Sequence, residues 1–242
     1  MDRRSFLKLL GLGGATVGVV RAGDVLAAPP GQGPRYAMVI DLRRCVGCQS
    51  CTVSCGLENR SPLGDFRTTV GEYVVRDADS GRSLIASLPR LCNHCEKPAC
   101  IPVCPVGATR QRPDGIVIID GSICIGCGFC VQACPYGARF LNHETKTADK
   151  CTFCAHRLSA GLLPACVENC VGGARHFGDI HNPDSLVSRM LRQYEGALAV
   201  LYPEKKTQPA VYYLGLDDFF ISAADVAAPM PYRDLRQGGS HA

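Results

Sequence analysis

The chain has 242 residues, 16 of them cysteine, with 46% apolar and 20% charged residues and a formal net charge of +4. This composition is typical of a globular protein of one or two domains and excludes an intrinsically disordered chain. The charge is small and no dense Lys/Arg stripe with interleaved aromatic residues accompanies it, so we expect no nucleic-acid partner.

Residues 1–27 are predicted to be an export signal. Arg3 and Arg4 precede an apolar run of 12 residues, Leu9 to Val20, and the small residues Ala27 and Ala28. This order resembles the twin-arginine signal, with cleavage expected after Ala27. The alternative is a basic amphipathic N-terminus that stays on the chain. The run is too short to span a bilayer, and no later apolar stretch is long enough, so no membrane span is expected after signal removal.

The cysteines fall into four groups of four, and none lies outside them. The groups are Cys45, Cys48, Cys51 and Cys55; Cys92, Cys95, Cys100 and Cys104; Cys124, Cys127, Cys130 and Cys134; and Cys151, Cys154, Cys166 and Cys170. The first and third groups have the C-x2-C-x2-C-x3-C spacing of bacterial ferredoxins. An exported chain with an even number of cysteines also suggests disulfides, and structural zinc is a further alternative. Zinc sites usually use isolated C-x2-4-C pairs, so the spacing favours four [4Fe–4S] clusters.

The spacing also predicts which cysteines share a cluster. In two-cluster ferredoxins the last cysteine of each run ligates the other cluster. We therefore expect cluster A on Cys45, Cys48, Cys51 and Cys170; cluster B on Cys55, Cys151, Cys154 and Cys166; cluster C on Cys92, Cys95, Cys100 and Cys134; and cluster D on Cys104, Cys124, Cys127 and Cys130. Residues 91–144 then form one ferredoxin unit, inserted into a second unit made of residues 36–90 and 145–181.

Secondary structure is expected to be short and loop-rich. Strand-like runs at 68–76 and 83–88 flank the turn residues 77–81, and runs at 108–111 and 115–120 flank a Pro-Asp-Gly turn. In the last segment, 182–242, we expect a helix with Asn182 as N-cap and Pro183 in its first turn, followed by a tail. The apolar stripe of that helix comprises Leu186, Val187, Met190, Leu191 and Tyr194. The stripe is expected to pack on the ferredoxin body, and contact with a partner is the alternative. The predicted fold class is α+β, two interleaved bacterial-type two-[4Fe–4S] ferredoxin units with short β-hairpins and a C-terminal helix.

The sequence predicts no catalytic site of its own, since it has no Ser/His/Asp order and no Gly-rich phosphate loop. His94 and His156 lie within or beside cysteine groups, but the cysteines already supply every ligand position. Four cations flank the groups: Lys150, Arg157, Arg110 and Arg139. They either raise the potential of a nearby cluster or belong to an ordinary solvated surface. Four clusters of net charge −2 each would bring the processed chain from about +2 to about −6.

Six segments resemble the electron-transfer beta subunits of the molybdopterin oxidoreductase family, most closely the iron–sulfur subunits of tetrathionate reductases. These segments are 36–55, 91–95, 142–145, 148–154, 160–168 and 213–218. The resemblance implies a non-catalytic subunit that passes electrons from a quinol-oxidising integral membrane anchor to a molybdopterin catalytic subunit. It implies a periplasmic location, peripheral to the inner membrane through those partners, and tetrathionate reduction to thiosulfate. The alternatives are the same role in a polysulfide, thiosulfate, arsenate or nitrite reductase complex, or a free periplasmic ferredoxin.

Overall fold

A four-stranded sheet joins parts of the chain that are far apart in sequence. Its strand order is β8-β1-β10-β9, formed by Arg175–Asp179, Tyr36–Asp41, Val211–Leu214 and Leu198–Ala199. Strand β1 runs antiparallel to β8 and parallel to β10. The four residues Ala37 to Ile40 of β1 are fully buried, because both faces of this central strand are covered. The computed structural model describes residues 33–76 and 83–216.

Three features expected from the sequence lie outside the described residues. They are the export signal with Arg3 and Arg4, the tip of the first hairpin at 77–82, and the end of the tail from residue 217. The chain divides into the units Met1–Gln32 and Gly33–Ala242, and the description below concerns the second unit alone.

The helix predicted after residue 182 is present, but its predicted start is wrong. Helix α6 spans Leu186–Gln193, and its N-cap is Ser185, whose hydroxyl accepts the Ser188 N–H at 3.0 Å. Asn182 instead accepts the Asp184 N–H at 2.9 Å and forms a tight turn ahead of the helix.

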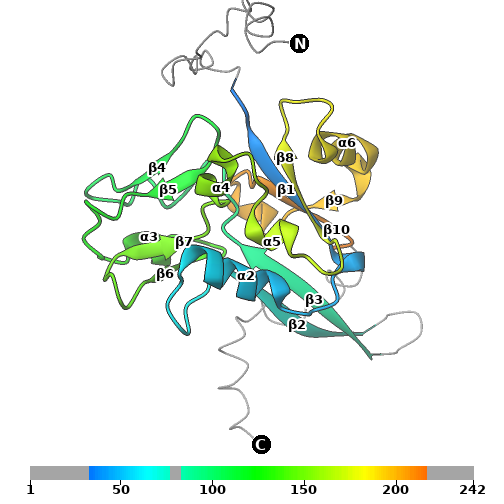
Figure 1. The fold of residues 1–242 in the computed structure, drawn as a ribbon, viewed down its shortest axis with the longest axis horizontal. Coiled ribbons are helices and arrows are strands. Elements are labelled where there is room, and N and C mark those ends of the chain that lie inside the picture. Colours follow the sequence, from blue (N-terminus) through cyan, green and yellow to red (C-terminus); the bar gives the residue numbers. More distant parts are fainter. Residues whose placement is uncertain (1–32, 77–82, 217–242) are drawn as a thin grey trace, which may run out of the picture. The chain divides into compact units, whose positions relative to one another are not determined.

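The apolar stripe of α6 packs on the central sheet, as predicted. Val187 and Met190 are buried against Ala37 and Val39 of β1, whereas Leu186 is 48% exposed. Figure 1 shows α6 beside β8.

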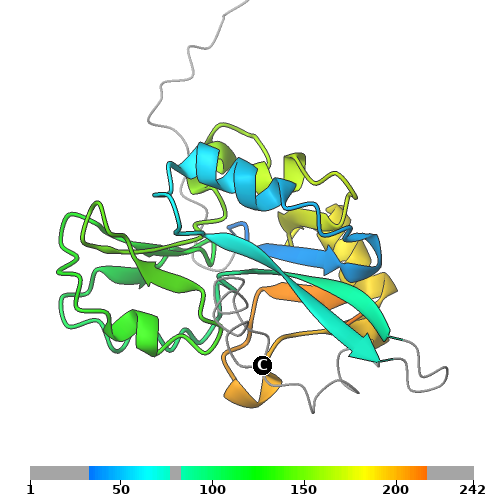
Figure 2. The ribbon, with the colours of Figure 1, turned by 90° about the horizontal axis from the view of Figure 1, so that it is seen from below.

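The remaining described strands form three two-stranded hairpins. Hairpin β2–β3, Thr68–Arg76 with Ser83–Leu91, is confirmed, and β3 continues three residues beyond the predicted end. Hairpin β4–β5, Thr109–Gln111 with Val117–Ile119, is confirmed around its predicted turn. Hairpin β6–β7, Arg139–Leu141 with Ala148–Lys150, was not predicted. Figure 2 shows β4 to β7 grouped on one side of this unit and the central sheet on the other, with β2–β3 crossing in front of the sheet in this view.

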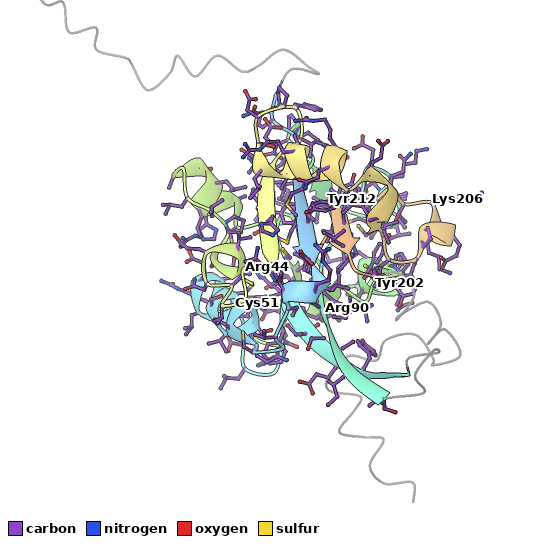
Figure 3. All side chains as sticks on the ribbon, turned by 90° about the vertical axis from the view of Figure 1, so that its right-hand side faces the viewer. Arg44, Cys51, Arg90, Tyr202, Lys206 and Tyr212 are labelled. Carbon is purple, nitrogen blue, oxygen red and sulfur yellow. The ribbon has the colours of Figure 1, made fainter. Side chains whose placement is uncertain are left out.

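Short helices contain cysteines or directly follow one. They are α2 (Ser50–Asn59), α3 (Phe129–Gln132), α4 (Ala155–Ser159) and α5 (Ala165–Glu168). Single 3-10 turns lie at η1 (Leu42–Arg44), η2 (Glu195–Ala197) and η3 (Pro203–Lys205). Figure 3 shows Cys51 and Arg44 toward the C-terminal end of β1, with Tyr202 and Lys206 on the other side of that strand in this view. In the part of the chain that is described, no helix has the length and apolar character needed to cross a membrane.

Candidate iron–sulfur centres

Strand register explains how the fourth cysteine of a predicted cluster is delivered. Ile40 of β1 pairs with Arg175 of β8 in an antiparallel ladder. Cys45 lies five residues after Ile40 and Cys170 five residues before Arg175, so both leave the ladder at the same end. These two cysteines belong to the predicted cluster A, although they are far apart in sequence.

The same arrangement recurs in the second predicted unit. Thr109 of β4 pairs with Ile119 of β5, again antiparallel. Cys104 lies five residues before Thr109 and Cys124 five residues after Ile119. Their segments therefore leave the hairpin at one end, which is where the predicted cluster D requires them.

The predicted ligands of cluster C surround one cavity. Its lining includes Cys92, Cys95, Cys100 and Cys134, together with Tyr136 and Arg139. Burial is the largest cause that raises the pKa of Cys95 to about 11, and the neighbouring thiols Cys92, Cys134 and Cys100 add to the rise. Four thiols around one cavity form the donor set that a [4Fe–4S] cluster requires.

The predicted ligands of cluster B also come together. Burial raises the pKa of Cys55 to about 12, with further contributions from Cys166 and Cys154. Burial likewise raises the pKa of Cys151, and its main thiol neighbours are Cys55 and Cys166. The Asn59 amide lies 3.5 Å from the Cys55 sulfur and 3.7 Å from the Cys154 sulfur.

Fewer contacts join the predicted ligands of clusters A and D than those of clusters B and C. Burial raises the pKa of Cys45, and Cys51 and Cys170 are among its thiol neighbours. Cys124 and Cys130 pack around Val117 and Ala148 in one apolar cluster. No described contact joins Cys48, Cys104 or Cys127 to another predicted ligand, so the ligand sets stay predictions.

N–H groups point at several of these sulfurs. Backbone N–H groups donate to Cys170 at 3.2 Å, Cys151 at 3.3 Å and Cys124 at 3.4 Å. Hydrogen bonds of this kind stabilise the negative charge of a cluster and raise its potential.

The cysteine loops also approach neighbouring backbone closely. A Cβ on Gly126, where φ is +68°, would clash with the carbonyl oxygen of Lys146. Glycine is therefore required where this loop meets the β6–β7 turn.

All sixteen cysteines are free thiols in this structure. Among the described residues, no three His, Cys, Asp or Glu side chains converge closely enough to hold one metal ion. A tetrahedral zinc site holds all its sulfurs about 2.3 Å from a single ion, whereas each thiolate of a cubane binds its own iron. The four thiols that line one cavity at the predicted cluster C supply one thiolate for each iron of such a cubane.

The two histidines singled out in the sequence have different surroundings. His94 is fully buried and its Nδ1 accepts the Val117 N–H at 3.0 Å, while its ring stacks on Phe153 with centroids 3.8 Å apart. Burial lowers the pKa of His94, followed by the nearby cations Lys150, Arg139 and Arg35. His156 lies at the surface and pairs with Glu58 at 2.8 Å.

The four flanking cations also divide into two kinds. Arg110 pairs with Asp120 at the surface, and the half-buried Arg157 pairs with Glu58 and Glu168. Arg139 and Lys150 are buried among cysteines. A third buried cation, Arg175, was missed by the sequence analysis, although it follows Cys170 at the same distance as Arg139 follows Cys134.

The fold and these thiol sites define a ferredoxin-type iron–sulfur protein. A family described as "4Fe-4S dicluster domain" matches residues 84–180. The chain is 58% identical to the B subunit of tetrathionate reductase from Salmonella typhimurium, over 91% of each chain. It is 45% identical to the B subunit of tetrathionate reductase from Archaeoglobus fulgidus, over 76% of this chain and 84% of the relative. It is 41% identical to the B subunit of sulfite dehydrogenase from Allochromatium vinosum, over 74% and 82%.

The chain belongs to the family of iron–sulfur subunits that includes the B subunits of tetrathionate reductases.

Proposed function

We propose that this protein relays electrons through four [4Fe–4S] clusters within a periplasmic reductase complex. Electrons enter from a quinol-oxidising membrane anchor and leave to a molybdopterin catalytic subunit. The substrate reduced there is tetrathionate, as the names of two relatives suggest. Substrate binding and bond cleavage belong to the catalytic subunit.

The exposure of the cysteines is the observation that carries this proposal. Cys48 and Cys127 are exposed, and the other fourteen are buried or half-buried. Cys48 belongs to the predicted cluster A and Cys127 to the predicted cluster D. A protein that receives electrons from one subunit and delivers them to another needs two accessible clusters and a protected path between them.

Thiol neighbours support a single order for that path. Cys51 of cluster A is among the thiol neighbours of Cys166 in cluster B. Cys92 of cluster C is among those of Cys151 in cluster B. Clusters C and D share Arg139 as a neighbour. The supported order is A, B, C, D, which puts the two accessible clusters at its ends.

The residues of this chain have three tasks in the relay. The cysteine thiolates hold each cluster, which supplies one-electron chemistry when bound. Backbone and side-chain N–H groups donate to the cysteine sulfurs and stabilise the reduced state. Buried residues such as Phe153 and Phe177, whose ring centroids lie 5.2 Å apart, exclude water from the interior between the sites.

The predicted export signal supports the periplasmic location. Thiols stay reduced in the cytosol, so clusters are best assembled there. The twin-arginine route carries folded cargo, and it would therefore carry the protein with its clusters in place. Replacing Arg3 and Arg4 by Lys is expected to leave the protein in the cytoplasm, and normal export of that variant would contradict the assignment.

The function is tested in membranes that contain the whole complex, by comparing wild type with Cys48→Ser. The variant is expected to lose tetrathionate-dependent quinol oxidation while retaining tetrathionate reduction by reduced viologen, which feeds the catalytic subunit directly. An unchanged quinol-linked rate would refute the relay. If wild type reduces another oxyanion but not tetrathionate, the substrate is wrong and the relay stands. Purification as a monomer without partners would favour a free ferredoxin.

A further inference from the structure

Three cations lie inside the protein without a carboxylate partner. Arg175 is 3% exposed, Arg139 is 4% exposed and Lys150 is 1% exposed. Every ion pair found within residues 33–76 and 83–216 involves other side chains. An unpaired buried charge costs several kcal/mol, so each of these cations requires an anion that the protein side chains do not supply.

Arg175 lies between the predicted clusters A and B. Its guanidinium donates to the Cys51 sulfur at 3.4 Å and to the Thr68 hydroxyl at 2.9 Å. Burial lowers the pKa of Arg175, but nearby thiols outweigh that effect, and the largest contribution comes from Cys166. Cys51 is a predicted ligand of cluster A and Cys166 of cluster B.

Arg139 has the equivalent place between clusters C and D. Its guanidinium donates to the Cys100 sulfur at 2.8 Å and to the Thr109 hydroxyl at 3.2 Å. Burial opposes its charge, whereas Cys100 and Cys92 of cluster C and Cys130 of cluster D favour it.

The two arginines occupy matching positions in the two units. Each is the fifth residue after the last cysteine of a group, follows a Gly-Ala pair and opens a strand, β6 or β8. The glycines of these pairs, Gly137 and Gly173, have φ values of +57° and +60°. The same loop therefore delivers one guanidinium to the interior of each unit.

Lys150 lies at the junction between the units. Its ammonium donates to the Cys151 carbonyl at 2.7 Å and to the Val117 carbonyl. Burial lowers the pKa of Lys150, and the nearby thiols Cys92 and Cys100 of cluster C and Cys151 of cluster B oppose that fall and favour the charged ammonium. Lys150 is also the register partner of Arg139 in the antiparallel hairpin β6–β7, so two buried cations lie directly opposite each other.

The missing anions match the predicted cofactors. A [4Fe–4S] core with four thiolates carries a net charge of −2 when oxidised and −3 when reduced. Each cation lies near thiols of two predicted clusters. Its attraction is stronger when either cluster holds the additional electron. The low dielectric of the interior enlarges this difference because water does not screen it.

We propose that Arg175, Lys150 and Arg139 are the counter-charges of the three cluster-to-cluster junctions, and that each raises the reduction potential of the two clusters it separates. The four clusters all carry negative charge, which opposes the addition of an electron to each. The cations offset this repulsion, so that each cluster can accept an electron from the preceding one. This inference rests on the proposed relay.

The test is an EPR-monitored redox titration of the purified holoprotein, with iron measured in each sample. Arg175→Gln, Lys150→Gln and Arg139→Gln each remove one charge and keep a hydrogen-bond donor. Arg175→Lys and Arg139→Lys retain the charge, and Arg110→Gln removes a surface charge of the same type. Cys48→Ser and Cys127→Ser assign the signals of the terminal clusters A and D.

Each Gln variant is expected to shift the equilibrium of its two adjacent clusters at least tenfold toward the oxidised form. For a one-electron couple this lowers the reduction potential by at least 59 mV. For the two clusters that are not adjacent to the substituted cation, the equilibrium between oxidised and reduced forms should change less than twofold. Arg175→Lys, Arg139→Lys and Arg110→Gln should keep reduction potentials near those of wild type. Equal shifts in all four clusters, or unchanged potentials at full iron content, would overturn the inference. If a Gln variant loses iron, the Met variant at that position is titrated, and a Met variant with wild-type potentials would also overturn it.

These results separate the inference from the proposed function. A wild-type protein that lacks about 16 irons refutes the relay itself. A protein with full iron and insensitive potentials leaves the relay intact and removes only the role of the cations.

Discussion

The hydrogen bonds of Asn59 should set the potential of cluster B. Its amide nitrogen lies 3.0 Å from the Cys55 carbonyl, 3.5 Å from the Cys55 sulfur and 3.7 Å from the Cys154 sulfur. One amide hydrogen serves the carbonyl, so one remains for the sulfurs. Arg67 fixes the amide orientation by donating to the Asn59 oxygen at 2.8 Å, and Asp149 holds Arg67 at 2.9 Å.

The perturbation is Asn59→Leu, which keeps the branching and the number of side-chain heavy atoms and removes both the donor and the acceptor. Sulfur is a weak acceptor, so we take a difference of about 1 kcal/mol between oxidised and reduced clusters. That energy corresponds to a shift of about 40 mV to lower potential for one electron. Arg67 also loses an acceptor, and the remaining exposure of its side chain limits that cost to about 1 kcal/mol of stability.

Asn59→Asp provides the matched comparison. It retains an acceptor for Arg67, removes the donor and adds a negative charge beside the sulfurs, so its potential should fall below that of Asn59→Leu. Redox titration followed by EPR gives the potentials, and thermal unfolding gives the stability. A cluster B potential in Asn59→Leu within about 10 mV of wild type at full iron content would refute the reasoning, since the expected shift is several times larger. A shift of equal size in cluster D would refute it as well.

Three further predictions concern the fold that positions the clusters. Val187→Ala should lower the free energy of unfolding by about 1.5–3 kcal/mol in chemical denaturation, while Leu186→Ala, at an exposed position, should change it by less than about 0.5 kcal/mol. Gly126→Ala should lower the iron content by up to about a quarter, because its Cβ has no room at positive φ, whereas Gly121→Ala, with open space around it, should retain all iron. The pKa of Asp41 is lowered mainly by its hydrogen bond from a neighbouring arginine, so Asp41→Asn should cost about 1 kcal/mol at pH 7. That cost should disappear as the pH falls from about 4 through the lowered pKa, and an undiminished cost at the lowest pH would contradict the linkage.

The sequence predicted the parts of the fold that local chemistry determines. Cysteine spacing predicted thiols that the structure places around one cavity, and turn residues predicted hairpins β2–β3 and β4–β5. The start of α6 was placed wrongly because Asn182 and Ser185 are both good caps, and the competing turn at Asn182 leaves the capping role to Ser185.

Long-range pairing was not accessible from sequence patterns. Strand β10 has four residues, and its parallel partner β1 lies far earlier in the chain. Short strands with distant partners carry little periodic signal, although the Val-Tyr-Tyr-Leu run suits a buried strand. Tyr213 in this run is fully buried, and its hydroxyl donates to the Pro89 carbonyl at 3.0 Å.

The burial of Lys150 and Arg139 could not be predicted from the sequence either, since cations near cysteines usually lie on a solvated surface. Their place depends on the register Arg139↔Lys150 in β6–β7. The same register brings Cys134, five residues before Arg139, and Cys151, directly after Lys150, to one end of the hairpin. Cys134 belongs to the predicted cluster C and Cys151 to cluster B, so this hairpin joins the two units. A slip of one residue would place the two cations on opposite faces of the hairpin, so one of them would leave the interior. The pairing that brings cysteines of two predicted clusters together therefore also places two buried cations beside them.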